Sequence, residues 1–211
     1  MIIDISQEVF SCRVYPGDPP PLRQRIGDMQ AGDAYNLTAF SMCAHNGTHV
    51  DAPLHFLREG KDIEQMGLRP FAGPCWVARR EGDLTAAEAE SILRSARASN
   101  AEARILIAGQ TVVTAEAARV FAAAGTLLLG NESQTVGPED APMAVHRLLL
   151  TAGVALLEGV VLDRVAEGPY FLSAAPLKMA GSDGAPCRAY LIAWDDCPGL
   201  WRDDDEAGRH E

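Results

Sequence analysis

The sequence lacks the features of a membrane, secreted or nucleic-acid-binding protein. It contains no apolar run approaching the ~20 residues that span a bilayer. The first residues, MIIDISQEVF, have no basic start and place Asp4 inside the first apolar stretch, so no signal peptide is predicted. Lys and Arg number 18 against 29 Asp and Glu, a net charge of −11, whereas phosphate backbones are bound by clustered basic residues. We therefore expect a cytoplasmic protein with no membrane and no nucleic-acid partner.

Cysteines and aromatic residues are also sparse. The five cysteines are widely spaced and form no CxxC pair, which argues against a disulfide framework or a thiolate zinc site. Cys43 is the cysteine nearest to a histidine-rich segment; a buried structural thiol is the expected role, and a thiol nucleophile is the alternative. Aromatic residues make up 6% of the chain, so the composition does not predict a pocket of stacked rings.

What is present is the composition of a globular α/β protein, with 47% hydrophobic residues. A chain of 211 residues fits one domain, predicted over 1–202. The charged tail at 203–211 is expected to be disordered and to leave His210 uninvolved. The fold class predicted is α/β, a single domain with a mixed sheet core and two or three main helices.

Helix signals occur only in the middle of the chain. Thr85 and Glu88 form a capping box that opens a helix running to about Ala98. Two further helices are predicted, from Thr114 to about residue 125 and over 140–152 with Gly153 as the cap. Strands are predicted over residues 1–9, 36–44, 75–80, 104–108, 126–129, 154–162, 170–179 and 187–194.

The most informative segment is HNGTHVDAPLH, at residues 45–55. It holds three of the five histidines and a carboxylate, the usual ligands of zinc and similar ions. Gly47 and Pro53 predict a loop or extended turn, which can direct its donors to one point. Taken alone, the segment predicts one metal site, with Asp51 close enough to share the ion with His49 and able to bridge to a second one.

A second ion needs ligands from elsewhere in the chain. His146 is the other histidine outside the tail, and it lies on the predicted 140–152 helix. Glu158 follows in the next predicted strand, where it interrupts the apolar run VALLEGVVL. A buried carboxylate is costly unless it is paired or binds a metal, so Glu158 is a candidate ligand. A packed core histidine and an ion-paired glutamate are the alternative readings.

With these residues in place, the chain resembles the cyclase family of metal-dependent hydrolases, which includes bacterial kynurenine formamidase and isatin hydrolase. HNGTHVDAPLH matches the family signature HxGTHxDxPxH. The similarity extends over YPGD at 15–18, GNESQTVGP at 130–138, the His146–Glu158 pair, the stretch 156–179 and APCRA at 185–189. The resemblance implies a swivelling β/β/α fold.

The resemblance also implies roles for individual residues. His45, His49 and Asp51 would hold one ion, and Asp51, His146 and Glu158 the other. His55 would be the general acid/base. Two divalent ions, Zn or Mn, would lower the pKa of bound water towards ~7, so that hydroxide is available at neutral pH to attack a carbonyl. Fe and Co are alternative ions, because histidine and carboxylate ligands bind them too.

The expected reaction is hydrolysis of a small amide, with an aryl formamide such as N-formylkynurenine as the best single substrate. Cyclic amides like isatin, lactones, or a dehydrating cyclisation on the same metals are the alternatives, and a non-catalytic metal-binding protein is an alternative of another class. The sequence departs from kynurenine formamidases in two places: Tyr15 stands where they carry Trp, and Gly130-Asn131-Glu132 where they carry a Gly-Ile-Asp type of sequence.

Further expectations concern contacts with substrate and between subunits. Tyr15 is a candidate substrate-binding residue. The glycine-rich stretch with Lys178, Ser182 and Asp183 is read as a plain surface loop, with substrate contact as the alternative. The resemblance implies a homodimer or homotetramer, in which the Tyr15 segment would serve a neighbouring subunit's site.

Overall fold

A nine-stranded mixed sheet and three α-helices form the framework of residues 1–196, the part of the chain that the structure, a computed structural model, describes. The predicted domain end at 202, the tail at 203–211 and His210 lie outside the described residues. The predicted α/β class, with a mixed sheet and up to three main helices, is confirmed. No helix within 1–196 is both long and apolar enough to cross a membrane.

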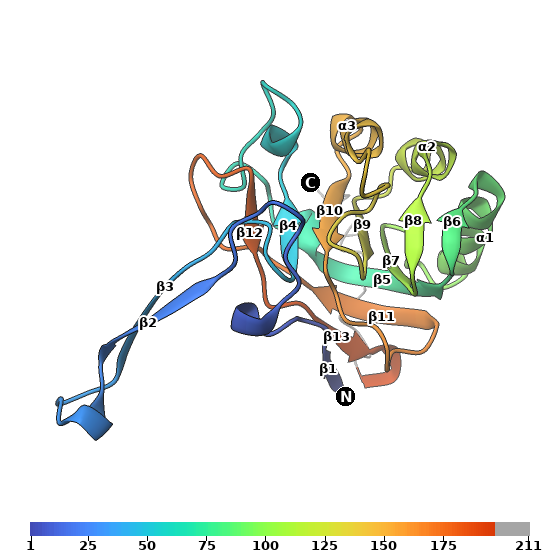
Figure 1. Cartoon of the computed structure of the whole chain (residues 1–211). Coiled ribbons are helices and arrows are strands. Elements are labelled where there is room, and N and C mark those ends of the chain that lie inside the picture. Colours follow the sequence, from blue (N-terminus) through green and yellow to red (C-terminus); the bar gives the residue numbers. More distant parts are fainter. Residues whose placement is uncertain (197–211) are drawn as a thin grey trace, which may run out of the picture.

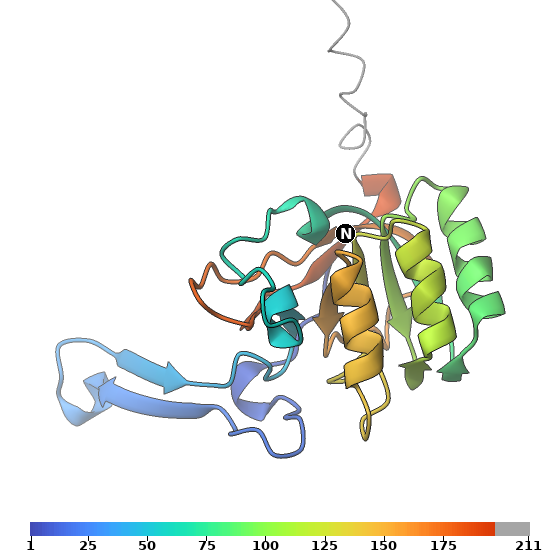
Figure 2. The same cartoon turned by 90° about the horizontal axis from the view of Figure 1, so that it is seen from above.

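Parallel strands form the centre of the sheet. In sheet order they are β5 (Ala72–Arg79), β7 (Arg104–Ala108), β9 (Leu128–Asn131) and β10 (Ala155–Glu158). Each is connected to the next through a helix: α1 (Ala86–Arg97), α2 (Ala115–Ala123) and α3 (Met143–Thr151). The three helices lie side by side on one face of the sheet (Figure 1), and Figure 2 shows the same layer from above.

Antiparallel strands extend the sheet at both ends. Beyond β5 lie β11 (Gly168–Ser173), β13 (Tyr190–Ala193) and β1 (Ile2–Asp4). Beyond β10 lie β4 (His49–Asp51) and β12 (Gly184–Pro186). Two small sheets stand apart: β6 (Gly82–Leu84) with β8 (Thr111–Val113), and β2 (Leu22–Gly27) with β3 (Leu37–Ser41).

Helix α1 begins as the sequence predicts. Thr85 caps it, and both hydrogen bonds of the capping box with Glu88 are present. Its buried residues, Ala89, Ile92, Leu93 and Ala96, follow the helical period and face the sheet. They belong to an apolar core between the sheet and the helices, and a second apolar core lies on the other face of the sheet.

The structure corrects the sequence-based elements in several places. Residues 49–51, predicted as part of a loop, form strand β4, because they pair with β10 on one side and with β12 on the other. Residues 184–186, for which no strand was predicted, form β12. Strand β2 was not predicted, because LRQRIG shows neither an apolar run nor a buried face. The predicted strands at 1–9, 154–162 and 170–179 are shorter than expected.

Candidate metal centre

Strand β4 carries two of the candidate ligands on one face. His49 and Asp51 alternate with Val50, so their side chains share a face of the sheet while Val50 enters the opposite core. Strand β10 pairs with β4 so that Glu158 lies directly opposite His49. Directly opposed residues of an antiparallel pair point to the same side, which brings these two side chains together.

The third element is helix α3, which packs over the same face. Gly153, at φ +79°, ends the helix and lets the chain reverse into β10. This turn places His146 against Glu158: Nε2 of the imidazole lies 3.0 Å from Oε1 of the carboxylate and 3.5 Å from Oδ2 of Asp51. The two residues, twelve positions apart in the sequence, thus meet where helix α3 packs against strand β10.

Backbone carbonyls fix the orientation of two imidazoles. Nδ1–H of His49 donates to the carbonyl of Gly47 (3.0 Å), and Nδ1–H of His146 donates to the carbonyl of Pro142 (2.9 Å). Each ring therefore turns Nε2 toward the two buried carboxylates. Nε2 of His49 lies 3.4 Å from Oδ1 of Asp51 and 3.5 Å from Oε2 of Glu158.

Two of these atoms lack any hydrogen-bond partner among the described residues. They are Nε2 of His49 and Oδ2 of Asp51, both fully buried. A buried polar atom without a partner is costly. Metal–ligand bonds of about 2.0–2.2 Å place neighbouring ligand atoms roughly 3–3.6 Å apart, which is the spacing found here. The residues present therefore fit a divalent ion.

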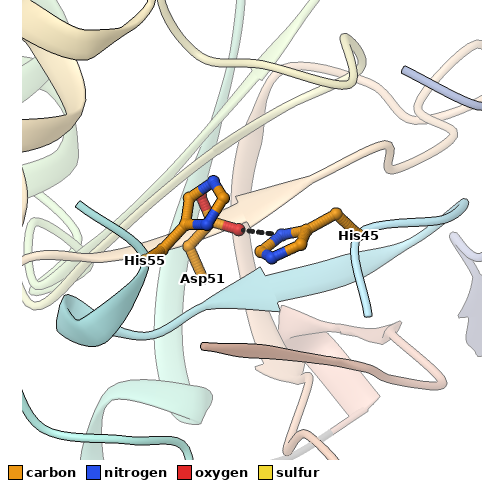
Figure 3. Close-up of side chains that lie close together, drawn as sticks. All are labelled: His45, Asp51 and His55. Carbon is orange, nitrogen blue, oxygen red and sulfur yellow. Dashed lines mark hydrogen bonds and ion pairs between the residues drawn. The ribbon is translucent and has the colours of Figure 1, made fainter. Parts of the chain in front are cut away.

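A second cluster lies beside the first. His45, in the turn before β4, and His55, in a short 3₁₀ helix (Pro53–His55) after it, stack with ring centroids 4.0 Å apart. His45 contacts Oδ1 of Asp51 through Nδ1 at 2.9 Å, the contact drawn as a dashed line in Figure 3. His45, Asp51 and His55 offer ligand atoms that all lie within 4.8 Å of one another, as do His49, Asp51 and Glu158.

Asp51 thus belongs to both groups, as expected for a bridging ligand. The partition differs from the one the resemblance implies: Glu158 groups with His49, and His55 groups with His45. His146 contacts Asp51 and Glu158 from α3. All six candidate metal and catalytic residues are brought together.

Asp183 is the residue whose contacts with the histidines the sequence did not predict. Its Oδ2 lies 3.0 Å from Nε2 of His45 and 3.0 Å from Nδ1 of His55. It precedes β12, which pairs with β4 and so draws the glycine-rich segment into the site. Gly184 is required there, because a Cβ atom would come within 2.6 Å of the His45 ring. The signal in the sequence was a carboxylate flanked by small residues, which is common in surface loops.

The electrostatics of the cluster favour positive charge. Burial alone would lower the pKa of His45, but its hydrogen bonds to Asp183 and Asp51 outweigh burial and raise that pKa to about 10. Burial would likewise lower the pKa of His49, yet Asp51 and Glu158 raise it to about 10. Burial raises the pKa of Asp51, but His45 and His49 hold it well below its usual value. Protons or metal ions between these groups supply the missing charge.

The side chains of the cluster line a cavity of about 350 Å³. Phe56, Pro142 and Tyr15 contribute apolar surface to its walls, and Gln134 and Thr135 contribute polar groups. Tyr15, the candidate substrate residue, lines this cavity and donates its hydroxyl to the carbonyl of Glu139 at 2.6 Å. Cys43 also lines the cavity, and its Sγ contacts Oδ2 of Asp18 at 3.6 Å.

Comparison with known proteins gives one family. The family model described as putative cyclase matches residues 3–138, a range that contains the HNGTHVDAPLH segment. A solved structure of a potential metal-dependent hydrolase with cyclase activity is 26% identical, with 90% of this chain and 96% of that chain covered and a TM-score of 0.74. The predicted metal-dependent hydrolase from Bacillus stearothermophilus is also 26% identical, covering 90% and 97%, with a TM-score of 0.72.

A third solved structure shares the fold at lower identity. Isatin hydrolase A from Labrenzia aggregata, bound to benzyl benzoate, is 21% identical, with 91% of this chain and 93% of that chain covered and a TM-score of 0.75. These alignments extend well beyond residue 138, so the shared fold includes most of the chain.

Proposed function

The chain belongs to the cyclase family, and from this membership and the geometry of the site we propose that it is a metal-dependent hydrolase of a small amide. One observation carries the proposal. Two buried imidazoles, His49 and His146, donate Nδ1–H to backbone carbonyls and present Nε2 to the carboxylates of Asp51 and Glu158 at 3.0–3.5 Å. That arrangement is costly for a structural core and is suited to a bound cation.

The proposed centre would hold two divalent ions, Zn or Mn. His45, His49 and Asp51 would hold one of them, and Asp51, His146 and Glu158 would hold the other. When bound, such ions lower the pKa of a water molecule and polarise the carbonyl group to be attacked. Two candidate ligand groups share Asp51, which supports a pair of ions rather than one, although these groups place Glu158 with His49 and His55 with His45.

His55 is the proposed proton carrier. Its side chain is 27% exposed and lines the cavity, whereas those of His49 and His146 are buried. Because Nδ1 is held by Asp183, Nε2 is the nitrogen left to exchange a proton with substrate. In amide hydrolysis the hydroxyl of water ends on the acyl carbon, the C–N bond breaks, and the departing nitrogen gains a proton. His55 accepts the proton of water and returns it to that nitrogen.

The cavity favours a small substrate with one aromatic ring. Its volume of about 350 Å³ is at the low end for small-molecule sites. Phe56, Pro142 and Tyr15 provide apolar wall, so a single ring carrying a formamide fits the site. We propose an aryl formamide as the substrate class, with N-formylkynurenine as the first compound to assay.

A cyclic amide is the second candidate, because a protein of the same fold is an isatin hydrolase. Opening a lactam or lactone uses the same attack on a carbonyl, and the departing group stays attached to the product. The site chemistry then differs only in how the cavity holds the ring.

A substrate panel on metal-reconstituted protein tests these alternatives. We expect turnover of N-formylkynurenine with Zn or Mn, and none after chelation. Turnover of isatin or simple lactones without turnover of the formamide would move the assignment to the second candidate. Stoichiometric metal binding without turnover of any amide or lactone would identify a non-catalytic metal-binding protein. Activity that resists chelation but is lost on alkylation would point instead to Cys43.

A further inference from the structure

Gln134 and Thr135, in the segment that follows β9, each carry a buried polar atom to which the proposed reaction gives no role. Oε1 of Gln134 and Oγ1 of Thr135 have no hydrogen-bond partner among the described residues. Thr135 is only 4% exposed. Both residues line the cavity of the candidate metal centre. A buried polar atom without a partner is costly, so these two atoms point to a ligand that supplies the missing hydrogen bonds.

The neighbours of Gln134 determine which end of its carboxamide is free. Nε2 donates to the carbonyl of Gly47 at 3.2 Å, the same carbonyl that accepts Nδ1–H of His49. Because a carbonyl oxygen can only accept, the nitrogen of the carboxamide has to face it, and Oε1 is the end left without a partner. Gly159 keeps this position open, since a Cβ atom there would overlap both Nε2 of Gln134 and the Gly47 carbonyl.

The free end of Gln134 requires a hydrogen-bond donor. A carboxamide oxygen only accepts, whereas the hydroxyl of Thr135 can accept or donate, so Gln134 determines the polarity of the group that fits. Two donors of the same wall are already paired: the hydroxyl of Tyr15 donates to a backbone carbonyl, and the thiol of Cys43 lies against the carboxylate of Asp18. The donor therefore comes from a molecule that enters the cavity.

We propose that Oε1 of Gln134 accepts a hydrogen bond from the N–H group of the substrate, with the hydroxyl of Thr135 as a second polar partner. The site then selects amides and lactams that carry an N–H over esters, lactones and N-alkylated amides. Those other compounds place an oxygen or an alkyl group where the donor should be and leave Oε1 unpaired. This selectivity rests on the proposed function, because it concerns the substrate of the same site.

The hydrogen bond to Gln134 strengthens during the reaction. As His55 gives a proton to the departing nitrogen, that nitrogen gains positive charge and its N–H becomes a better donor. An interaction that is stronger in the transition state than in the bound substrate raises kcat, whereas one that is equal in both lowers only KM. Gln134 is therefore expected to act mainly on the kcat of substrates that carry an N–H.

Three compounds that differ at one ring position test the selectivity. Isatin carries the N–H, N-methylisatin carries a methyl group there, and benzofuran-2,3-dione carries an oxygen without added bulk. The kcat/KM of isatin is divided by that of each analogue, after correction for spontaneous hydrolysis. Both values come from one preparation of protein, so differences in metal content or folding cancel in the ratio.

The ratios are compared between the wild type, Q134L, T135V and the matched control Q65L. Gln65 is exposed, lies outside the cavity and accepts a hydrogen bond from the backbone of Asp62. Q134L is expected to lower both ratios about 10–100-fold, mainly through the kcat of isatin, because a buried acceptor then no longer favours the N–H. T135V is expected to lower them less, and Q65L not at all.

Unchanged ratios in Q134L overturn the proposal. A fall in the N-methyl ratio alone also overturns it, since Gln134 would then exclude bulk rather than bind the N–H.

Binding to the wild type gives a second measurement that needs neither a variant nor turnover. Oxindole and N-methyloxindole are titrated calorimetrically into metal-loaded protein, and oxindole is expected to bind about 10-fold more tightly. Equal affinity, or weaker binding of oxindole, contradicts the role of Gln134. If no amide or lactam is turned over, the proposed function fails, whereas the comparison of the two oxindoles still decides whether Gln134 binds an N–H.

Discussion

Nδ1 of His55 donates a hydrogen bond to Oδ2 of Asp183 at 3.0 Å. The same oxygen lies 3.0 Å from Nε2 of His45, so one carboxylate joins the proposed proton carrier to a proposed metal ligand. The hydrogen bonds from both imidazoles hold the pKa of Asp183 far below its usual value, which keeps the carboxylate charged. Asp183 is therefore a positioning residue: it fixes the tautomer and the ring plane of His55.

Replacing Asp183 by Asn tests this role. D183N keeps the size of the side chain and removes its charge. We expect kcat to fall about 10–100-fold, with KM and metal content little changed, in line with the loss of an outer partner of such a site. The loss of kcat should be greatest for amides whose leaving amine is strongly basic. Such an amine departs only after it has been protonated, so these substrates depend most on the proton from His55. Steady-state kinetics on a series of substituted formanilides, with metal analysis, measures both.

A matched control separates positioning from loop structure. Asp62 holds the same segment through the backbone N–H of Gly181 (2.7 Å) but does not contact either histidine. D62N is expected to show no dependence on the leaving group. An equal loss across all leaving groups in D183N would contradict the positioning role.

Replacing His55 by Ala separates its two possible roles. As the proton carrier, His55 contributes about 10²–10⁴-fold to turnover, so H55A should lose that factor and keep two ions per chain. As a ligand, in the group it forms with His45 and Asp51, it would take one ion with it. Inductively coupled plasma spectrometry on purified H55A, alongside its kcat, decides between them; full retained turnover excludes both roles.

The sequence predicts the ligands better than the strands that hold them. HNGTHVDAPLH identified His45, His49 and Asp51 as a set, because ligand types and spacing are local properties of the chain. That His49 and Asp51 form the strand between β10 and β12 depends on partners more than a hundred residues away. No local pattern in three residues reveals this.

The remaining residues differ in how far the sequence revealed them. Glu158 was identifiable because a charge inside an apolar strand is exceptional, and His146 because it is the other histidine outside the tail, on the helix that precedes that strand. Nothing in the sequence distinguished Asp183, because a short polar residue beside glycines is common in surface loops. Strand β2 was missed for a related reason: a strand exposed on both faces lacks the periodicity that burial imposes.

Replacing Glu158 by Gln is expected to abolish binding of at least one metal ion. Gln keeps the shape but supplies neither the charge nor both oxygens that face His49 and His146. Glu132 is the matched control, a buried glutamate whose oxygens accept hydrogen bonds from the backbone of Gly109 and Leu162. E132Q should cost about 1–3 kcal/mol of stability, because an amide NH₂ then faces a backbone donor, and should keep its metal. Calorimetric metal titration of both variants makes the comparison; equal metal loss in the two would refute a ligand role for Glu158.

Removing the metal is expected to make stability depend on pH. In the metal-free folded chain the pKa values of His45 and His49 are about 10, against about 6.5 for an unfolded histidine. Groups whose pKa is raised by folding stabilise the protein fully below the unfolded pKa, and that contribution is lost as pH rises through the folded pKa. The Tm of chelator-treated protein should therefore fall between about pH 6.5 and 10. The metal-loaded protein should not show this fall, since ligand nitrogens carry no proton, and its Tm should be higher throughout because the ion binds only the folded chain. Differential scanning calorimetry of both forms over this range provides the measurement, and parallel curves for the two would show that no ion replaces those protons.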